Sequence, residues 1–131
     1  MNKILTRLSG FLFILIAFFS SFQLWGQTQN QIKSVNNDEF LKLMKNKDVV
    51  IIDVRTPKEF NEGHIPNAIN IDYRSDAFMD RIKKLNKDKI LAIYCRSGSR
   101  SKSAAKKLIE AGFDVYELNK GIMNWTGDIS N

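Results

Sequence analysis

The sequence predicts an α/β domain built on a mainly parallel sheet, with helices on both faces of the sheet. Strand-like and helix-like patterns alternate along the chain from residue 32 onward, and this alternation is typical of parallel sheets. The run at residues 49–54 (Val-Val-Ile-Ile-Asp-Val) is mostly apolar and rich in β-branched side chains, as expected of a strand covered on both faces. No linker, internal repeat or low-complexity tract interrupts the pattern, so one domain is predicted over residues 27–131.

The first half of this domain is predicted to contain a strand at 32–35, a helix beginning near Asn36, a strand at 49–54, a short helix from Thr56 to Gly63 and a strand at 68–71. Thr56 followed by Pro57 is a typical helix start, because threonine caps the first turn and proline is tolerated there. Glu59 completes the pattern of a capping box.

The second half is predicted to contain a helix at 75–85, a strand at 89–94, a helix from about Ser101 to Gly112, a strand at 115–118 and a short helix at 121–125. The helix at 75–85 is indicated by the apolar residues Phe78, Ile82 and Leu85. In the final segment, Trp125 is expected to fill the core.

The N-terminal segment, residues 1–26, is predicted to be a secretory signal peptide. Lys3 and Arg7 precede an unbroken apolar run at 11–19, and a more polar stretch follows that ends near Gly26. The apolar run is shorter than a membrane-spanning helix requires. We therefore expect a periplasmic or otherwise exported protein that has no membrane contact after cleavage; an uncleaved membrane anchor at residues 4–25 is the alternative.

The composition narrows the choice of partners. The formal net charge is +6, but the lysines are spread along predicted polar helix faces, so we expect solvated surfaces and no binding of nucleic acid. Cys95 is the only cysteine. It cannot form a disulfide within the chain, so it is either inert and buried or a free thiol with a function.

The surroundings of Cys95 favour the functional interpretation. Cys95 lies between a predicted strand and a predicted helix, where backbone N–H groups and the helix dipole stabilise an anion and hence the thiolate. Small residues allow the loop to curl tightly, and arginines add positive charge. The sequence therefore predicts a sulfur nucleophile in an anion-binding loop formed by Arg96, Ser97, Gly98, Ser99 and Arg100.

Four segments in order resemble the rhodanese family of sulfurtransferases. Residues 53–60 resemble its Asp-Val-Arg-x-x-x-Glu-Phe segment, and residues 62–71 are similar to its Gly-His-Ile-Pro-x-Ala segment. Residues 94–101 match its Cys-Arg-x-Gly-x-Arg-Ser loop. Residues 121–125 resemble the closing Gly-Gly-x-x-x-Trp element, with Lys120 where the first glycine is common.

The resemblance implies a rhodanese-like three-layer α/β/α fold with a five-stranded sheet, and a persulfide mechanism. The Cys95 thiolate would attack the outer sulfur of an anionic donor such as thiosulfate, and sulfite would leave. Cyanide, a small thiol or a protein thiol would then accept the sulfur from Cys95. This chemistry requires no metal and no organic cofactor.

Other functions remain open at this point. The same cysteine would serve a sulfur or polysulfide carrier that turns over thiosulfate poorly, and an inactive interaction domain is a third possibility. A cysteine phosphatase or arsenate reductase is disfavoured, because those enzymes use a loop with five residues between cysteine and arginine, whereas four separate Cys95 from Arg100.

Three further polar residues have either a functional or a structural role. Arg55 follows a neighbouring strand, where it either binds the substrate anion or pairs with a carboxylate. Asp53 is expected to bind backbone groups. His64, the only histidine, is expected to pack under a turn, because a thiolate held by amides needs no separate base.

Overall fold

The computed structural model describes residues 31–131. The predicted signal peptide at 1–26, and the alternative anchor at 4–25, lie outside the described residues. None of the helices in the described part is long and apolar enough to span a membrane.

The centre of the domain is a five-stranded sheet in which every neighbouring pair of strands is parallel. In spatial order the strands are β1 (Lys33–Val35), β5 (Asp114–Leu118), β4 (Ile90–Tyr94), β2 (Val49–Asp53) and β3 (Ile69–Asn70). The longest pairing joins β2 to β4, with Ile51 opposite Ala92 and Asp53 opposite Tyr94. The predicted α/β class and the five-stranded parallel sheet are thereby confirmed.

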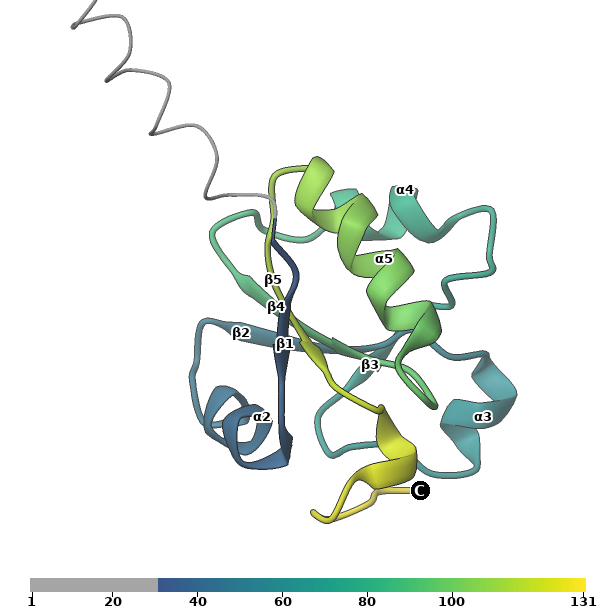
Figure 1. Cartoon of the computed structure of the whole chain (residues 1–131). Coiled ribbons are helices and arrows are strands. Elements are labelled where there is room, and N and C mark those ends of the chain that lie inside the picture. The colour runs from purple at the N-terminus through teal and green to yellow at the C-terminus, as the bar shows by residue number, and fades with distance from the viewer. Residues whose placement is uncertain (1–30) are drawn as a thin grey trace, which may run out of the picture. The chain divides into compact units, whose positions relative to one another are not determined.

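Helices cover both faces of the sheet, as Figure 1 shows. One face carries α4 (Phe78–Lys83) and α5 (Ser99–Glu110), and the other carries α2 (Asn37–Met44). The short helix α3 (Pro57–Asn61) and the 3-10 helix η2 (Ile122–Asn124) follow β2 and β5. Capping boxes begin α2 at Asn36 and α3 at Thr56, as the sequence predicts for α3.

Each face of the sheet has its own apolar core, because side chains alternate between the two faces along each strand. In β4, Leu91 and Ile93 point toward α4 and α5, while Ala92 and Tyr94 point toward α2. The second core is centred on the fully buried Phe40, whose ring meets those of Tyr94 and Trp125 edge to face. Cys95 continues the alternation of β4 on the α5 side.

Most elements differ from their predicted bounds by a residue or two, and the helix predicted at 75–85 differs most. The helix predicted at 75–85 is shortened to α4, because hydroxyl and carboxylate side chains bind nearby backbone amides in place of helical bonds: Ser75 Oγ accepts from Ala77, and Asp72 Oδ1 from Arg74. The strand predicted at 68–71 pairs only at 69–70. Helix α5 begins at Ser99, two residues earlier than predicted, because Gly98 already serves as its N-cap.

Candidate active site

Cys95 lies at the carboxyl end of the central strand β4, where ligands bind in parallel α/β sheets. Its side chain is only 1% exposed and belongs to the core on the α5 side. The sulfur accepts a hydrogen bond from the Gly98 N–H at 3.1 Å and donates one to the Ser101 hydroxyl at 3.4 Å. The predicted loop therefore curls around the sulfur, with a backbone amide aimed at it from the N-cap of α5.

Two glycines give the loop this shape. Gly98 has φ +105° and Gly121 has φ +63°, both in a region that other residues rarely adopt. A Cβ atom on Gly121 would lie 2.4 Å from the Arg96 carbonyl oxygen, so only glycine fits there. Because Gly121 packs this closely, η2 lies against the loop, and the Ile122 N–H donates to the Cys95 carbonyl at 2.9 Å.

The side chains of the predicted anion-binding loop divide into two groups. Arg96, Ser97 and Ser99 are exposed, whereas Gly98 is buried. Arg100 is partly buried and points toward α3, where its two terminal nitrogens donate to the two oxygens of Glu59, both at 2.8 Å. The two arginines are therefore not equivalent: one side chain faces solvent, and a carboxylate holds the other.

Glu59 joins two elements that are distant in the sequence. It completes the capping box of α3 by accepting from the Thr56 N–H at 3.1 Å, and it binds Arg100 of α5 with both oxygens. The Arg100 hydrogen bonds hold the pKa of Glu59 well below its ordinary value, at about 2, and Glu59 in turn raises the pKa of Arg100. This pair fixes the N-terminal turn of α5 against α3.

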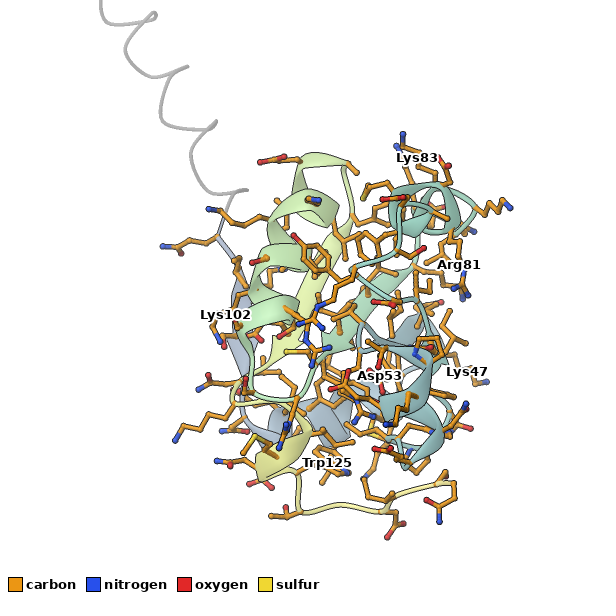
Figure 2. All side chains as sticks on the ribbon, turned by 90° about the vertical axis from the view of Figure 1, so that its right-hand side faces the viewer. Lys47, Asp53, Arg81, Lys83, Lys102 and Trp125 are labelled. Atoms are coloured by element: carbon orange, nitrogen blue, oxygen red, sulfur yellow. The ribbon has the colours of Figure 1, made fainter. Side chains whose placement is uncertain are left out.

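Arg55 makes its contacts away from the Cys95 sulfur. Its guanidinium donates to both oxygens of Asp53 and, at 2.7 Å, to the Gly63 carbonyl oxygen, and the residue is 6% exposed. Asp53 also accepts from the Arg55 N–H, so this carboxylate binds both side chain and backbone. Figure 2 shows Asp53 in the interior. The contacts correspond to the carboxylate-pairing interpretation of Arg55.

A buried polar network beneath Cys95 was not predicted from the sequence. The Ser101 hydroxyl lies 3.0 Å from Glu117 Oε2 and 3.1 Å from the Gly98 carbonyl oxygen. Glu117 is fully buried on β5 and also contacts Ser34 and Lys102. One feature of the sequence could have indicated this network: Glu117 is the single acid within the apolar run at 115–118, and a buried acid requires polar partners.

Other candidate features lie apart from the sulfur. The His64 ring stacks on Phe60 at 3.8 Å, and its Nδ1 lies 3.1 Å from the Phe60 carbonyl oxygen, consistent with packing under a turn. Within residues 31–131, no cluster of three or more His, Cys, Asp or Glu side chains is arranged to hold a metal ion.

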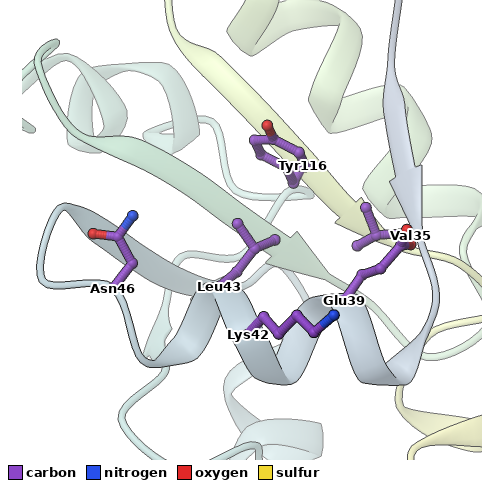
Figure 3. A pocket seen from close by; sticks show the side chains of 6 residues that line it. All are labelled: Val35, Glu39, Lys42, Leu43, Asn46 and Tyr116. Atoms are coloured by element: carbon purple, nitrogen blue, oxygen red, sulfur yellow. The ribbon is translucent and has the colours of Figure 1, made fainter.

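A groove of about 270 Å³ opens between α2 and the strands β1 and β5. It is lined by Val35, Glu39, Lys42, Leu43, Asn46 and Tyr116 (Figure 3).

This geometry defines a class of protein: an α/β domain with a buried cysteine in a tight loop at a helix N-terminus. Residues 36–128 match the model of the rhodanese-like domain. The chain therefore belongs to the rhodanese family.

Named relatives agree with this assignment. A thiosulfate sulfurtransferase, GlpE, of Coxiella burnetii is 35% identical over 94 residues, covering 71% of this chain and 86% of that protein. A putative sulfurtransferase, YtwF, of Bacillus subtilis is 37% identical over 87 residues, covering 66% and 82%. A rhodanese-related protein of Thermoplasma volcanium superimposes with a TM-score of 0.67 at 29% identity, covering 75% and 97%. The chain is thus a sulfurtransferase-like rhodanese domain.

Proposed function

We propose that the protein transfers sulfane sulfur from thiosulfate, or a related anionic donor, to cyanide or a thiol through a persulfide on Cys95. The observation that carries the proposal is the Gly98 N–H, 3.1 Å from the Cys95 sulfur at the N-cap of α5. An amide and a helix N-terminus aimed at a sulfur stabilise an anion there, and both the thiolate and the persulfide are anions. The named sulfurtransferase relatives support the same chemistry.

The proposed reaction has two displacement steps. In the first, the Cys95 thiolate attacks the outer sulfur of thiosulfate; a sulfur–sulfur bond forms at Cys95, the bond within thiosulfate breaks, and sulfite leaves with the electron pair. In the second, cyanide or a thiolate attacks the outer sulfur of the persulfide, and Cys95 leaves as a thiolate. Electrons and charge balance without a redox partner or metal.

The loop residues have proposed roles in the first step. The backbone of Arg96, Ser97, Gly98, Ser99 and Arg100 binds the donor anion, and the exposed Arg96 side chain attracts it. Arg100 acts mainly by fixing α5 through Glu59. Arg55 acts indirectly, by holding Asp53 and the Gly63 carbonyl beside the strand ends.

One observation favours the sulfur-carrier alternative as a second candidate. Both terminal nitrogens of Arg100 are engaged by Glu59, so Arg96 is the loop guanidinium that faces solvent. A loop with one solvent-facing arginine would bind a doubly charged donor less tightly than a loop with two. A carrier would form the persulfide and pass it to a protein thiol, with slow turnover of thiosulfate.

The first test is the intact mass of the purified protein before and after thiosulfate, with Cys95→Ser alongside. A gain of one sulfur, about 32 Da, that is lost on adding cyanide and absent in the variant is the result expected of a nucleophilic thiolate. A persulfide that forms readily while cyanide turnover stays slow would favour the carrier. If no donor, polysulfide included, adds sulfur to Cys95, the proposal is wrong.

We also propose that the protein is exported and that residues 1–26 are removed. The basis is the charged start, the apolar run at 11–19 and the small residue at Gly26. The mass of the untreated protein purified from an exporting host gives the cleavage position directly. A full-length mass in a membrane fraction would support the anchor alternative.

A further inference from the structure

A fully buried carboxylate, that of Glu117, is linked to the Cys95 sulfur through the Ser101 hydroxyl, which contacts both. Glu117 is 0% exposed and points from β5 toward α5. One of its oxygens accepts a hydrogen bond from the Ser34 hydroxyl and lies 3.1 Å from Lys102 Nζ; the other lies 3.0 Å from Ser101 Oγ. These three donors satisfy both oxygens of the Glu117 side chain, as burial of a charged group requires.

Ser101 has one hydroxyl proton and two oxygen acceptors for it. The acceptors are Glu117 Oε2 at 3.0 Å and the Gly98 carbonyl oxygen at 3.1 Å. Hydrogen bonds to a charged acceptor are the stronger ones, so the carboxylate draws the proton. Ser101 then presents a lone pair to Cys95 and accepts from its S–H at 3.4 Å. In this arrangement Ser101 stabilises the thiol and cannot donate to the thiolate.

We propose that Glu117 is a positioning residue that tunes Cys95 by withholding the Ser101 proton from the sulfur. The inference rests on the proposed function, in which Cys95 reacts as a thiolate. When Cys95 ionises, the Ser101 hydroxyl must turn from Glu117 to the sulfur, and Glu117 retains Ser34 and Lys102 as partners. Glu117 therefore opposes formation of the thiolate, both by competing for this proton and by its own negative charge.

The other charged groups around Cys95 differ from Glu117 either in the sign of their charge or in how closely an opposite charge pairs with them. Asp53 and Glu59 are paired with arginines, at 2.7 Å and 2.8 Å. The partner of Glu117 is Lys102, whose side chain is 46% exposed and therefore partly screened by water. Figure 2 places Lys102 at the surface of α5. The charged groups around Cys95 are Arg96 on the loop, Arg100 and Lys102 on α5, Glu117 on β5, Glu59 on α3, Asp53 at the end of β2 and Arg55 just after it.

Tuning of this kind changes two properties of the sulfur in opposite directions. A thiol that ionises less readily is less abundant as thiolate at low pH, but each thiolate is a stronger nucleophile. Glu117 would thus lower the fraction of the resting sulfur that is ionised, which lowers its exposure to oxidation, and would make the ionised sulfur more reactive toward a donor. A residue with only a structural role would not couple these two properties.

The experiment measures alkylation of Cys95 by iodoacetamide, a small neutral reagent, across pH in the wild type and in Glu117→Gln. We expect the midpoint of the alkylation profile to move about one pH unit lower, as for removal of a nearby like charge. We expect the plateau rate at high pH to fall about threefold, as a Brønsted slope of roughly 0.4–0.5 implies. Glu110→Gln removes the same charge from the exposed end of α5 and should leave both values unchanged.

Lys102→Met tests the other half of the ion pair and keeps the inference testable if Glu117→Gln fails to fold. Removal of this cation should move the midpoint upward and raise the plateau. A midpoint that does not move or rises in folded Glu117→Gln, or that moves downward in Lys102→Met, would overturn the inference. Alkylation requires no sulfur donor, so a protein that forms no persulfide but shifts as expected would refute the proposed function and leave the tuning intact.

Discussion

Gly121 sits at the point where the end of the chain meets the Cys95 loop. Its φ of +63° and ψ of −164° belong to a region that is essentially restricted to glycine. Its Cα approaches the loop so closely that a Cβ would lie within 2.6 Å of the carbonyl oxygens of both Cys95 and Arg96. The position of the loop backbone therefore depends on residue 121 being a glycine, which has no side chain.

Substitution of Gly121 by alanine should destabilise the protein and displace the loop. We expect a loss of at least about 1–3 kcal/mol from backbone strain alone, plus the cost of moving two carbonyl groups. Urea denaturation measures the loss, and the mass assay measures the persulfide yield. The matched control is Gly112→Ala, which has φ +92° but nothing within 4 Å of its Cβ. Equal losses in the two variants would show that the close approach is unimportant.

At the residue scale, the sequence predicted the residues of the loop but not their partners. The loop is one continuous segment of the chain. Its strand, its small residues and its helix follow one another in the sequence, so the positions of Cys95 and Gly98 could be predicted from neighbouring residues alone. Glu59 meets Arg100, and Glu117 meets Ser101, only because the chain returns to the same place after many residues. No local pattern predicts such contacts, although an acid in an apolar strand is a signal.

At the scale of elements, α3 and α5 are joined by the pair of Glu59 with Arg100. The folded-state pKa of Glu59 is about 2, below its ordinary value of 4.5. The pair therefore contributes its full stability above about pH 4.5, and that contribution is lost as the pH falls through about 2.

Substitution of Glu59 by glutamine should remove this pH dependence. Glutamine preserves the capping box of α3, so the change isolates the ion pair. We expect the variant to be less stable at neutral pH by about 1.5–3 kcal/mol, as for a hydrogen bond between charged groups, and to lose less stability than the wild type between pH 4.5 and 2. Urea denaturation at several pH values measures both. Glu62→Gln, an exposed neighbour, is the control, and parallel curves for Glu59→Gln and wild type would refute the assignment.

The elements themselves were largely predictable because their signals are local. The capping box at Thr56 and the apolar runs of β2 and β4 fall where the sequence placed them. The helix that differed most is α4, where the side chains of Asp72 and Ser75 compete for backbone groups before the helix begins. This competition depends on loop geometry, which periodicity does not describe.

At the scale of the whole molecule, two cores share one sheet. The core opposite Cys95 is centred on Phe40, which packs against Tyr94, the residue just before the cysteine. The continuous apolar run at 49–54 predicted that both faces of the sheet are covered. It could not predict the order β1-β5-β4-β2-β3, which is set by long-range pairing.

Substitution of Phe40 by alanine should therefore lower the stability of the whole domain and not of α2 alone. We expect a loss of about 3–5 kcal/mol, typical of a buried phenylalanine, in a single cooperative transition. Leu43→Ala, on the same helix at the edge of the groove, is partly exposed and should cost less. Two separate transitions, or a larger loss for Leu43→Ala, would contradict this view.

Because all five strands run in the same direction, β1 begins with Lys33 at the amino end of the sheet, and the Cys95 loop lies at the opposite, carboxyl end. The C-terminus, in contrast, lies near α3 (Figure 1), and Ser130 pairs with His64, which follows that helix. For immobilisation on a sensor surface, a linker joined just before Ile32 would leave the sulfur open to an acceptor protein. A linker fused after Asn131 would crowd the helix that carries Glu59.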